Sequence, residues 1–93
     1  MLTQFSILFY LYCAWENFPP TYRVYFNDEL MTEREYIWNN DTQVLQENLP
    51  VIADVDIPHI IRIEQVKPQS GIFTVRDVQI LPADKADVTV EIV

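Results

Sequence analysis

The chain has 93 residues, of which 49% are hydrophobic and 13% aromatic, and its formal net charge at pH 7 is -8. This composition excludes an intrinsically disordered chain, and the length fits a single domain over residues 1–93 with one modest core. The acidic balance argues against binding to nucleic acid or to an anionic membrane surface, because both need clustered Lys and Arg and the six basic residues are scattered.

The first predicted element is a long strand from Leu2 to Trp15, because its side chains alternate with period two. One phase of the alternation is almost purely apolar, and the other carries Leu8, Tyr10 and Tyr12. The segment lacks the basic start of a signal peptide and is shorter than a membrane helix. We therefore expect a strand with apolar or aromatic side chains on both faces.

Six further strand patterns follow, separated by turn signals at intervals of roughly 8–12 residues. They cover Thr21–Phe26, Leu30–Trp38, Gln43–Ile52, His59–Val66, Ile72–Leu81 and Val88–Val93. Together the seven patterns predict an all-β fold, an antiparallel β-sandwich of jelly-roll or immunoglobulin-like type. The residues expected to point inward are Phe5, Ile7, Phe9, Val24, Ile61, Ile63, Phe73, Val75 and Val90. A helix over Glu29–Tyr36 is the one alternative to a strand.

Turn-forming and strand-breaking residues add detail to this fold. Asn27-Asp28 predicts a tight turn, since both residue types tolerate the dihedral angles that such turns require. Pro50 lacks a backbone N–H, so its strand is expected at a sheet edge or with a bulge. The C-terminal strand is a second candidate edge, and an open edge can pair with a neighbouring chain. Lys67 to Gly71 predicts a hairpin-like connection.

The sequence contains few residues in arrangements that support catalysis or metal binding. No serine lies in a nucleophile motif, and one histidine and one cysteine do not fill a zinc shell. We expect no enzymatic activity, no catalytic residue, no cofactor and no metal, with Cys13 a buried small hydrophobe and His59 a turn or strand-edge residue. A calcium ion in the loop that contains Asp54 and Asp56 stays open as an alternative.

Twelve aromatic residues are many for so small a core, and surface aromatic side chains usually mark an interface. The candidate interface residues are Leu8, Tyr10, Tyr12, Trp15, Tyr25, Tyr36 and Trp38. Exposed aromatic rings also stack against sugars, so a carbohydrate-binding surface is the alternative interpretation of the same side chains.

The stretch Thr21–Arg34, followed by Trp38 and by Gln46-Glu47-Asn48, resembles short all-β proteins of tailed bacteriophages, particularly those of marine cyanobacteria. The likeness spans about Thr21 to Ile80. It implies a virion protein made in the host cytoplasm, such as a capsid-decoration or tail-associated subunit, that contacts other virion proteins or copies of itself. A β-sandwich module that recognises a host-surface glycan is the alternative function.

Overall fold

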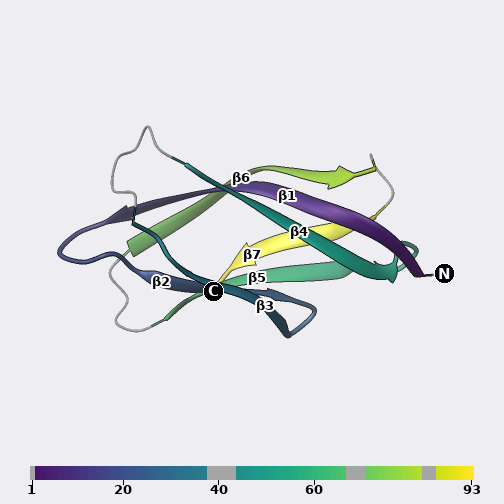
Figure 1. Ribbon diagram of the computed structural model, residues 1–93, viewed down its shortest axis with the longest axis horizontal. Helices are drawn as coiled ribbons and strands as arrows, with labels where there is room; N and C mark the ends of the chain where they lie inside the picture. Colours follow the sequence, from purple (N-terminus) through teal and green to yellow (C-terminus); the bar gives the residue numbers. More distant parts are fainter. Residues whose placement is uncertain (1, 38–43, 67–70, 83–85) are drawn as a thin grey trace.

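The computed structural model describes residues 2–37, 44–66, 71–82 and 86–93, which form seven strands in two sheets (Figure 1). The strands are β1 (Leu2–Trp15), β2 (Thr21–Phe26), β3 (Glu29–Glu35), β4 (Leu45–Asp54), β5 (His59–Val66), β6 (Gly71–Leu81) and β7 (Val88–Ile92). A three-stranded sheet has the order β4-β1-β6, and a four-stranded sheet has the order β3-β2-β5-β7. The prediction of an all-β sandwich is confirmed, and the alternative helix over Glu29–Tyr36 is wrong because Glu29–Glu35 is a strand.

Strand β7 departs from the antiparallel prediction. It pairs in parallel with β5, from His59 opposite Val88 to Ile63 opposite Ile92, and the two strands lie side by side in Figure 1. Strand β6 lies between them in sequence but belongs to the other sheet. The chain therefore crosses to the three-stranded sheet after β5, so the predicted hairpin-like connection into Gly71 is wrong; residues 67–70 lie outside the described ranges.

The core fills the space between the two sheets. The inward phase of β1 places Phe5, Ile7, Phe9 and Leu11 there, each with 2% or less of its surface exposed. The predicted inward residues that are buried are Phe5, Ile7, Phe9, Val24, Ile61, Ile63 and Phe73, while Val75 and Val90 are half-buried and pack against the same core. The period-two pattern thus identifies the inner faces of β1, β2 and β5 and the inward position of Phe73 on β6.

Asn and Asp occupy the left-handed backbone positions found in the described part of the chain. Among the described residues, positive φ angles occur at Asn17, Asn27, Asp28 and Asp77, whereas Gly71 has none. Asn27 and Asp28, at 49° and 72°, join β2 to β3 in a two-residue turn whose twist suits a hairpin, as predicted. Asp77 lies where β6 shifts its register against β1.

Both predicted edge strands lie at sheet edges. Strand β4, which contains Pro50, is an edge of the three-stranded sheet, and β7 is an edge of the four-stranded sheet. The missing N–H of Pro50 is tolerated there, because an edge strand pairs on one side only. The opposite edges are β6 and β3.

Candidate functional site

The side chains of the three-stranded sheet that point away from the core form a surface that we call the low-charge face. The pairing register brings Leu8 beside Asn48 and Gln79, and Tyr10 beside Gln46 and Arg76. The main part of the face comprises Leu8, Tyr10, Tyr12, Gln46, Asn48, Ile52, Thr74, Arg76 and Gln79. None of these residues is acidic, although the chain has 14 Asp and Glu residues. Asp54 continues the outward phase of β4 opposite Leu2, so a carboxylate lies at that end of the same sheet. Strands far apart in sequence thus build one surface whose main part carries no carboxylate.

Aromatic and apolar side chains give the low-charge face its character. Tyr10 and Tyr12 are half-buried along β1, and Ile52 on the neighbouring edge strand is 69% exposed. The guanidinium carbon of Arg76 lies 5.0 Å from the centre of the Tyr12 ring, which is a cation–π contact. The charged side chain in the main part of the face therefore lies over an aromatic ring.

The outer face of the four-stranded sheet is different. Arg62 pairs with Asp28 at 2.7 Å, and its guanidinium carbon lies 5.3 Å from the centre of the Tyr25 ring. Arg23 pairs with Glu33 on the same side of the sheet. Charged pairs of this kind are typical of a solvated surface, whereas the centres of protein interfaces are depleted of charge.

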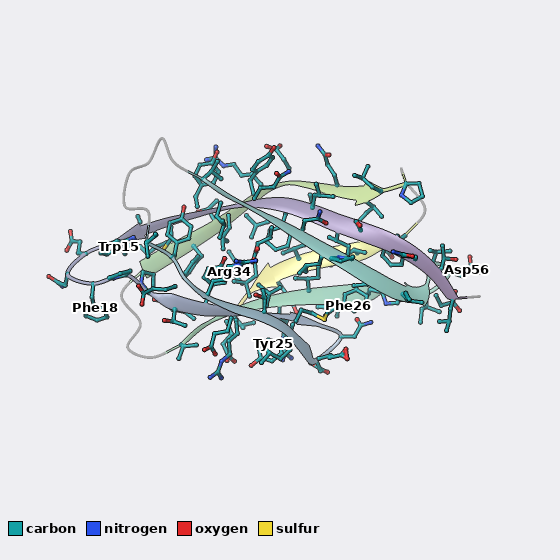
Figure 2. All side chains as sticks on the ribbon, in the orientation of Figure 1. Trp15, Phe18, Tyr25, Phe26, Arg34 and Asp56 are labelled. Atoms are coloured by element: carbon teal, nitrogen blue, oxygen red, sulfur yellow. The ribbon has the colours of Figure 1, made fainter. Side chains whose placement is uncertain are left out.

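The predicted interface residues separate into several places in the structure. Leu8, Tyr10 and Tyr12 come together on the low-charge face. Trp15 is half-buried against the core at the end of the molecule that also carries Phe18 (Figure 2). Tyr25 lies on the outer face of the other sheet, and Trp38 lies outside the described residues.

The prediction of Tyr36 as an interface residue is corrected by its position in the structure. It was expected at an interface, but only 1% of its surface is exposed. It follows the last residue of β3, and its hydroxyl donates a hydrogen bond to the Leu11 carbonyl oxygen at 3.2 Å. The strand pattern was expected to continue to Trp38, but β3 ends at Glu35 and the ring of Tyr36 enters the core.

The amide side chains of the low-charge face were missed at the sequence level. Gln46 and Asn48 alternate with buried Glu47 and Leu49 along β4, so the pattern itself marks them as outward-facing. Only the register with β1 shows that they lie beside Tyr10 and Leu8. The alternation of exposed and buried residues along β4 does not show which residues of β1 lie opposite, so it could not predict these neighbours.

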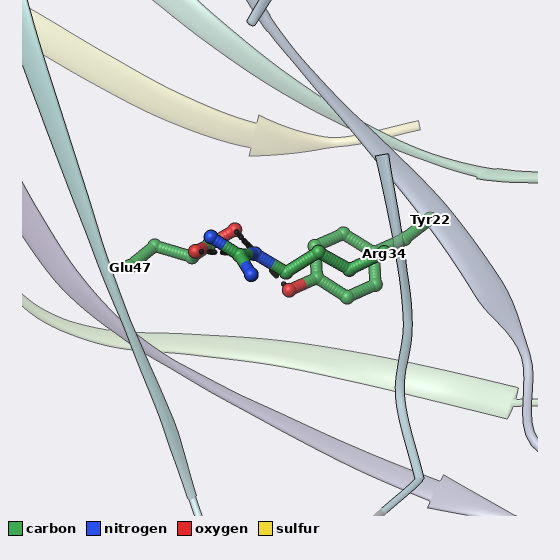
Figure 3. Close-up of polar contacts among 3 residues, drawn as sticks. All are labelled: Tyr22, Arg34 and Glu47. Atoms are coloured by element: carbon green, nitrogen blue, oxygen red, sulfur yellow. Dashed lines mark hydrogen bonds and ion pairs between the residues drawn. The ribbon is translucent and has the colours of Figure 1, made fainter. Parts of the chain in front are cut away.

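A buried polar network connects the two sheets at the β3–β4 side (Figure 3). Only 2% of the Glu47 surface is exposed. The Tyr22 hydroxyl donates to Oε2 of Glu47 at 3.2 Å, and Nε of Arg34 lies 3.1 and 3.3 Å from its two carboxylate oxygens. Burial and the Glu47 carboxylate raise the pKa of Tyr22, so the hydroxyl stays protonated as a donor. The arrangement suits a structural link between sheets rather than proton transfer.

His59 is held in one neutral tautomer by its hydrogen bonds. The N–H of Ile60 donates to Oδ1 of Asn27 at 2.9 Å, which orients the amide so that its Nδ2 donates to Nδ1 of His59 at 2.8 Å. The other ring nitrogen, Nε2, donates to the Asp54 carbonyl oxygen at 2.6 Å. His59 begins β5 as predicted for a strand end, but it is buried and both ring nitrogens are engaged. It has no free nitrogen to act as a general base.

Two other side chains that could react, Cys13 and Asp54, make contacts within the fold. Cys13 is half-buried and packs against the core, and burial raises the pKa of its thiol to about 11. Oδ1 of Asp54 accepts a hydrogen bond from the N–H of Asp56 within their turn. Within the described ranges, no group of three or more His, Cys, Asp or Glu side chains is arranged to hold a metal ion. No helix in these ranges has the length and apolar character needed to cross a bilayer.

Comparison with protein-family models, with curated proteins and with solved structures finds no match to this chain. Function is therefore inferred from the residues and their arrangement.

Proposed function

We propose that this protein is a non-enzymatic interaction protein that joins a larger assembly through the low-charge face. The observation that carries the proposal is the absence of carboxylates from the main part of this face, in a chain with 14 acidic residues. Carboxylates elsewhere favour solubility, while a surface with Tyr and little charge matches the composition of interface centres. Together with the bacteriophage resemblance, this supports a virion component, either a capsid-decoration or a tail-associated subunit.

The size of the sheet sets the contribution that this face can make. Its strands have 14, 10 and 11 residues, and at about 3.3 Å per residue and about 4.8 Å per strand the whole outer face covers about 550 Å². A standard protein interface buries about 800 Å² on each partner, so this face supplies about two thirds of such a contact.

A carbohydrate-binding function is the second candidate, and one observation favours it. Tyr10 is flanked by the amide of Gln46, and Leu8 lies between the amides of Asn48 and Gln79. Aromatic rings pack against the C–H faces of sugars, and neighbouring amides exchange hydrogen bonds with hydroxyl groups. Screening on a glycan array tests this alternative directly.

The assembly proposal is tested with the double variant Tyr10→Ser/Tyr12→Ser. We expect it to lose binding to its partner by about 100-fold or more, because aromatic anchors at an interface centre each contribute roughly 2 kcal/mol or more. Pull-downs with candidate virion proteins and size-exclusion chromatography with light scattering measure the loss. Circular dichroism verifies that the fold is kept.

The matched control is Tyr25→Ser/Ile60→Ser, which removes a tyrosine and an apolar side chain from the outer face of the other sheet. Binding should persist in this control. Equal loss of binding in both double variants, or retention in both, would show that the low-charge face is not the contact surface.

A further inference from the structure

Three of the four strands at sheet edges in the described part of the chain carry features that hinder pairing with a further strand. Strand β4 contains Pro50, four of the seven residues of β3 are charged, and β6 bulges against β1 around Asp77, whose φ angle is 57°. Proline, charged side chains and bulges all protect an open edge. Strand β7 contains neither proline nor bulge, and Glu91 is its one charged residue. It is therefore the edge most open to strand addition.

Alternate residues of β7 direct their backbone groups to the open edge. The N–H of His59 donates to the Asp87 carbonyl oxygen at 2.8 Å, and the N–H of Val93 donates to the Ile63 carbonyl oxygen at 3.0 Å. Successive residues of a strand direct their N–H and C=O groups to opposite sides, so the odd-numbered residues from 87 to 93 face β5. The even-numbered residues of the strand face away from β5, and they are Val88, Val90 and Ile92.

The inward side chains of β7 are less covered than those of its neighbour β5. Ile61 and Ile63 on β5 are fully buried, whereas Val88 and Val90 are half-buried and Ile92 is 43% exposed. The sheet that ends in β7 has four strands and packs against a sheet of three, so β7 lies at the margin of the core. A further strand beside β7 would cover these side chains as well as its backbone groups.

We propose that β7 pairs in antiparallel orientation with the β7 strand of a second copy of this chain, about a two-fold axis through Val90. Val90 then lies opposite Val90 of the second copy, and Val88 lies opposite Ile92. These are the residues whose backbone groups face the open edge, so each pair of opposed residues exchanges two hydrogen bonds. The two four-stranded sheets become one continuous sheet, and the inward side chains of β7 gain apolar neighbours.

A second copy is the occupant that the sequence of β7 favours, because the strand complements itself in this register. Glu91 lies opposite Thr89 of the second copy, so no two carboxylates face each other within the paired strands. Centring the pair on Glu91 would place two carboxylates opposite each other, which is unfavourable. Centring it on Thr89 would leave Ile92 outside the paired residues. The register through Val90 is therefore the one that uses every outward backbone group of the strand.

The contact is small, so the dimer should be weak. Strand β7 has five residues and is about 17 Å long, which is well short of a standard interface. We expect a dissociation constant between about 10 µM and about 1 mM. Pairing should tighten as salt is added, because each copy carries a net charge of -8. The dimer leaves the low-charge face free and does not depend on the function proposed for that face.

Sedimentation equilibrium from about 10 µM to about 1 mM measures the pairing, and substitutions of Thr89 test the register. Thr89 is exposed and lies opposite Glu91 of the second copy in the proposed dimer. Thr89→Glu should weaken the dimer by about tenfold or more, because it opposes like charges twice across the two-fold axis. Thr89→Lys should strengthen it by about threefold or more, because it places opposite charges together.

The matched controls are Thr74→Glu and Thr74→Lys, which make the same changes of charge at an exposed threonine of β6. They should alter the affinity by less than about threefold, because charges beyond a Debye length are largely screened.

A further pair of variants tests the backbone contact. Val90→Pro removes the N–H that faces the open edge rather than β5, and an edge strand tolerates proline in that orientation, so the fold should persist while the dimer is lost. Val90→Ala removes the side chain but keeps the N–H, and it should weaken the dimer by less than about tenfold. Circular dichroism verifies the fold of each variant. If Val90→Pro does not fold, the variants of Thr89 decide the outcome.

The proposal is overturned if the wild type remains monomeric at about 1 mM in high salt, or if the Thr89 and Thr74 variants change the affinity to the same extent. A dimer that survives in folded Val90→Pro would also overturn it. The double variant Tyr10→Ser/Tyr12→Ser should dimerise like the wild type, so a complex formed through the low-charge face is recognised as one that sediments faster than this dimer. Dimerisation that is lost in that double variant would assign the contact to the low-charge face and would overturn the pairing of β7.

Discussion

At the scale of single residues, the buried carboxylate of Glu47 is the group whose environment matters most for stability. It is stabilised by Arg34, whose side chain is half-exposed, and by the Tyr22 hydroxyl. We expect Arg34→Ala to lower the free energy of unfolding by about 1–3 kcal/mol, because a buried charge keeps only one neutral donor. Water reaches Arg34, so the loss is smaller than for a fully buried pair. Chemical denaturation measures the effect.

The exposed pair of Arg23 and Glu33 is the control for this prediction. Arg23→Ala should lower the free energy of unfolding clearly less than Arg34→Ala does, because both partners of this pair are solvated. Adding Glu47→Gln to Arg34→Ala should recover part of the loss, since the uncompensated charge is then removed. Similar costs for the two arginine variants would contradict the structural role assigned to Glu47.

The buried thiol of Cys13 should make the folding stability of the protein depend on pH in the alkaline range. Its pKa is raised from 9.0 to about 11 by burial in the folded protein. Because the pKa of the thiol is higher in the folded protein than in the unfolded chain, its protonated form contributes to folding stability below about pH 9. This contribution is lost as the pH rises from about 9 to 11. Denaturation midpoints at several pH values should therefore fall more steeply for the wild type than for Cys13→Ala. Tyr22 is present in both proteins, so parallel curves would show that Cys13 does not titrate in this way.

At the scale of elements, the turn between β2 and β3 does more than reverse the chain. Substitution by glycine should have opposite effects on stability at its two residues, Asn27 and Asp28. Asn27→Gly should cost about 1–2 kcal/mol, because the side chain binds both His59 and the Ile60 backbone. Asp28→Gly should be neutral or stabilising by up to about 1 kcal/mol, since glycine accepts its positive φ and only an exposed ion pair with Arg62 is lost. Thermal unfolding of both variants distinguishes the effects, and a larger loss for Asp28→Gly would contradict this account.

The sequence predicts the strands better than it predicts their neighbours. The bounds of β1, β2 and β5 are those expected, because alternation directly reports which face of a strand is buried. Alternation does not report pairing, so the parallel position of β7 and the separation of β5 from β6 were not foreseen. For the same reason, Tyr10 and Tyr12 could be placed on one face from sequence, but their polar neighbours on β4 and β6 could not.

At the scale of the whole molecule, the uneven distribution of charge is the feature on which the proposed function rests. The net charge of -8 makes copies of the chain repel one another in dilute salt. Contacts through the low-charge face would involve few charges, so salt would weaken them little while it screens this repulsion. If the partner is a second copy, self-association should therefore strengthen as salt is added.

Sedimentation velocity tests the central claim, that the protein works by assembly, most directly. The wild-type chain is measured from about 10 µM to about 1 mM at low and high salt, alone and mixed with candidate virion proteins, a range that covers weak and tight contacts. The account predicts a faster-sedimenting species in at least one of these mixtures or at high concentration, and its loss in Tyr10→Ser/Tyr12→Ser. A wild-type chain that sediments only as a monomer under every condition would contradict the claim and move carbohydrate binding to first place.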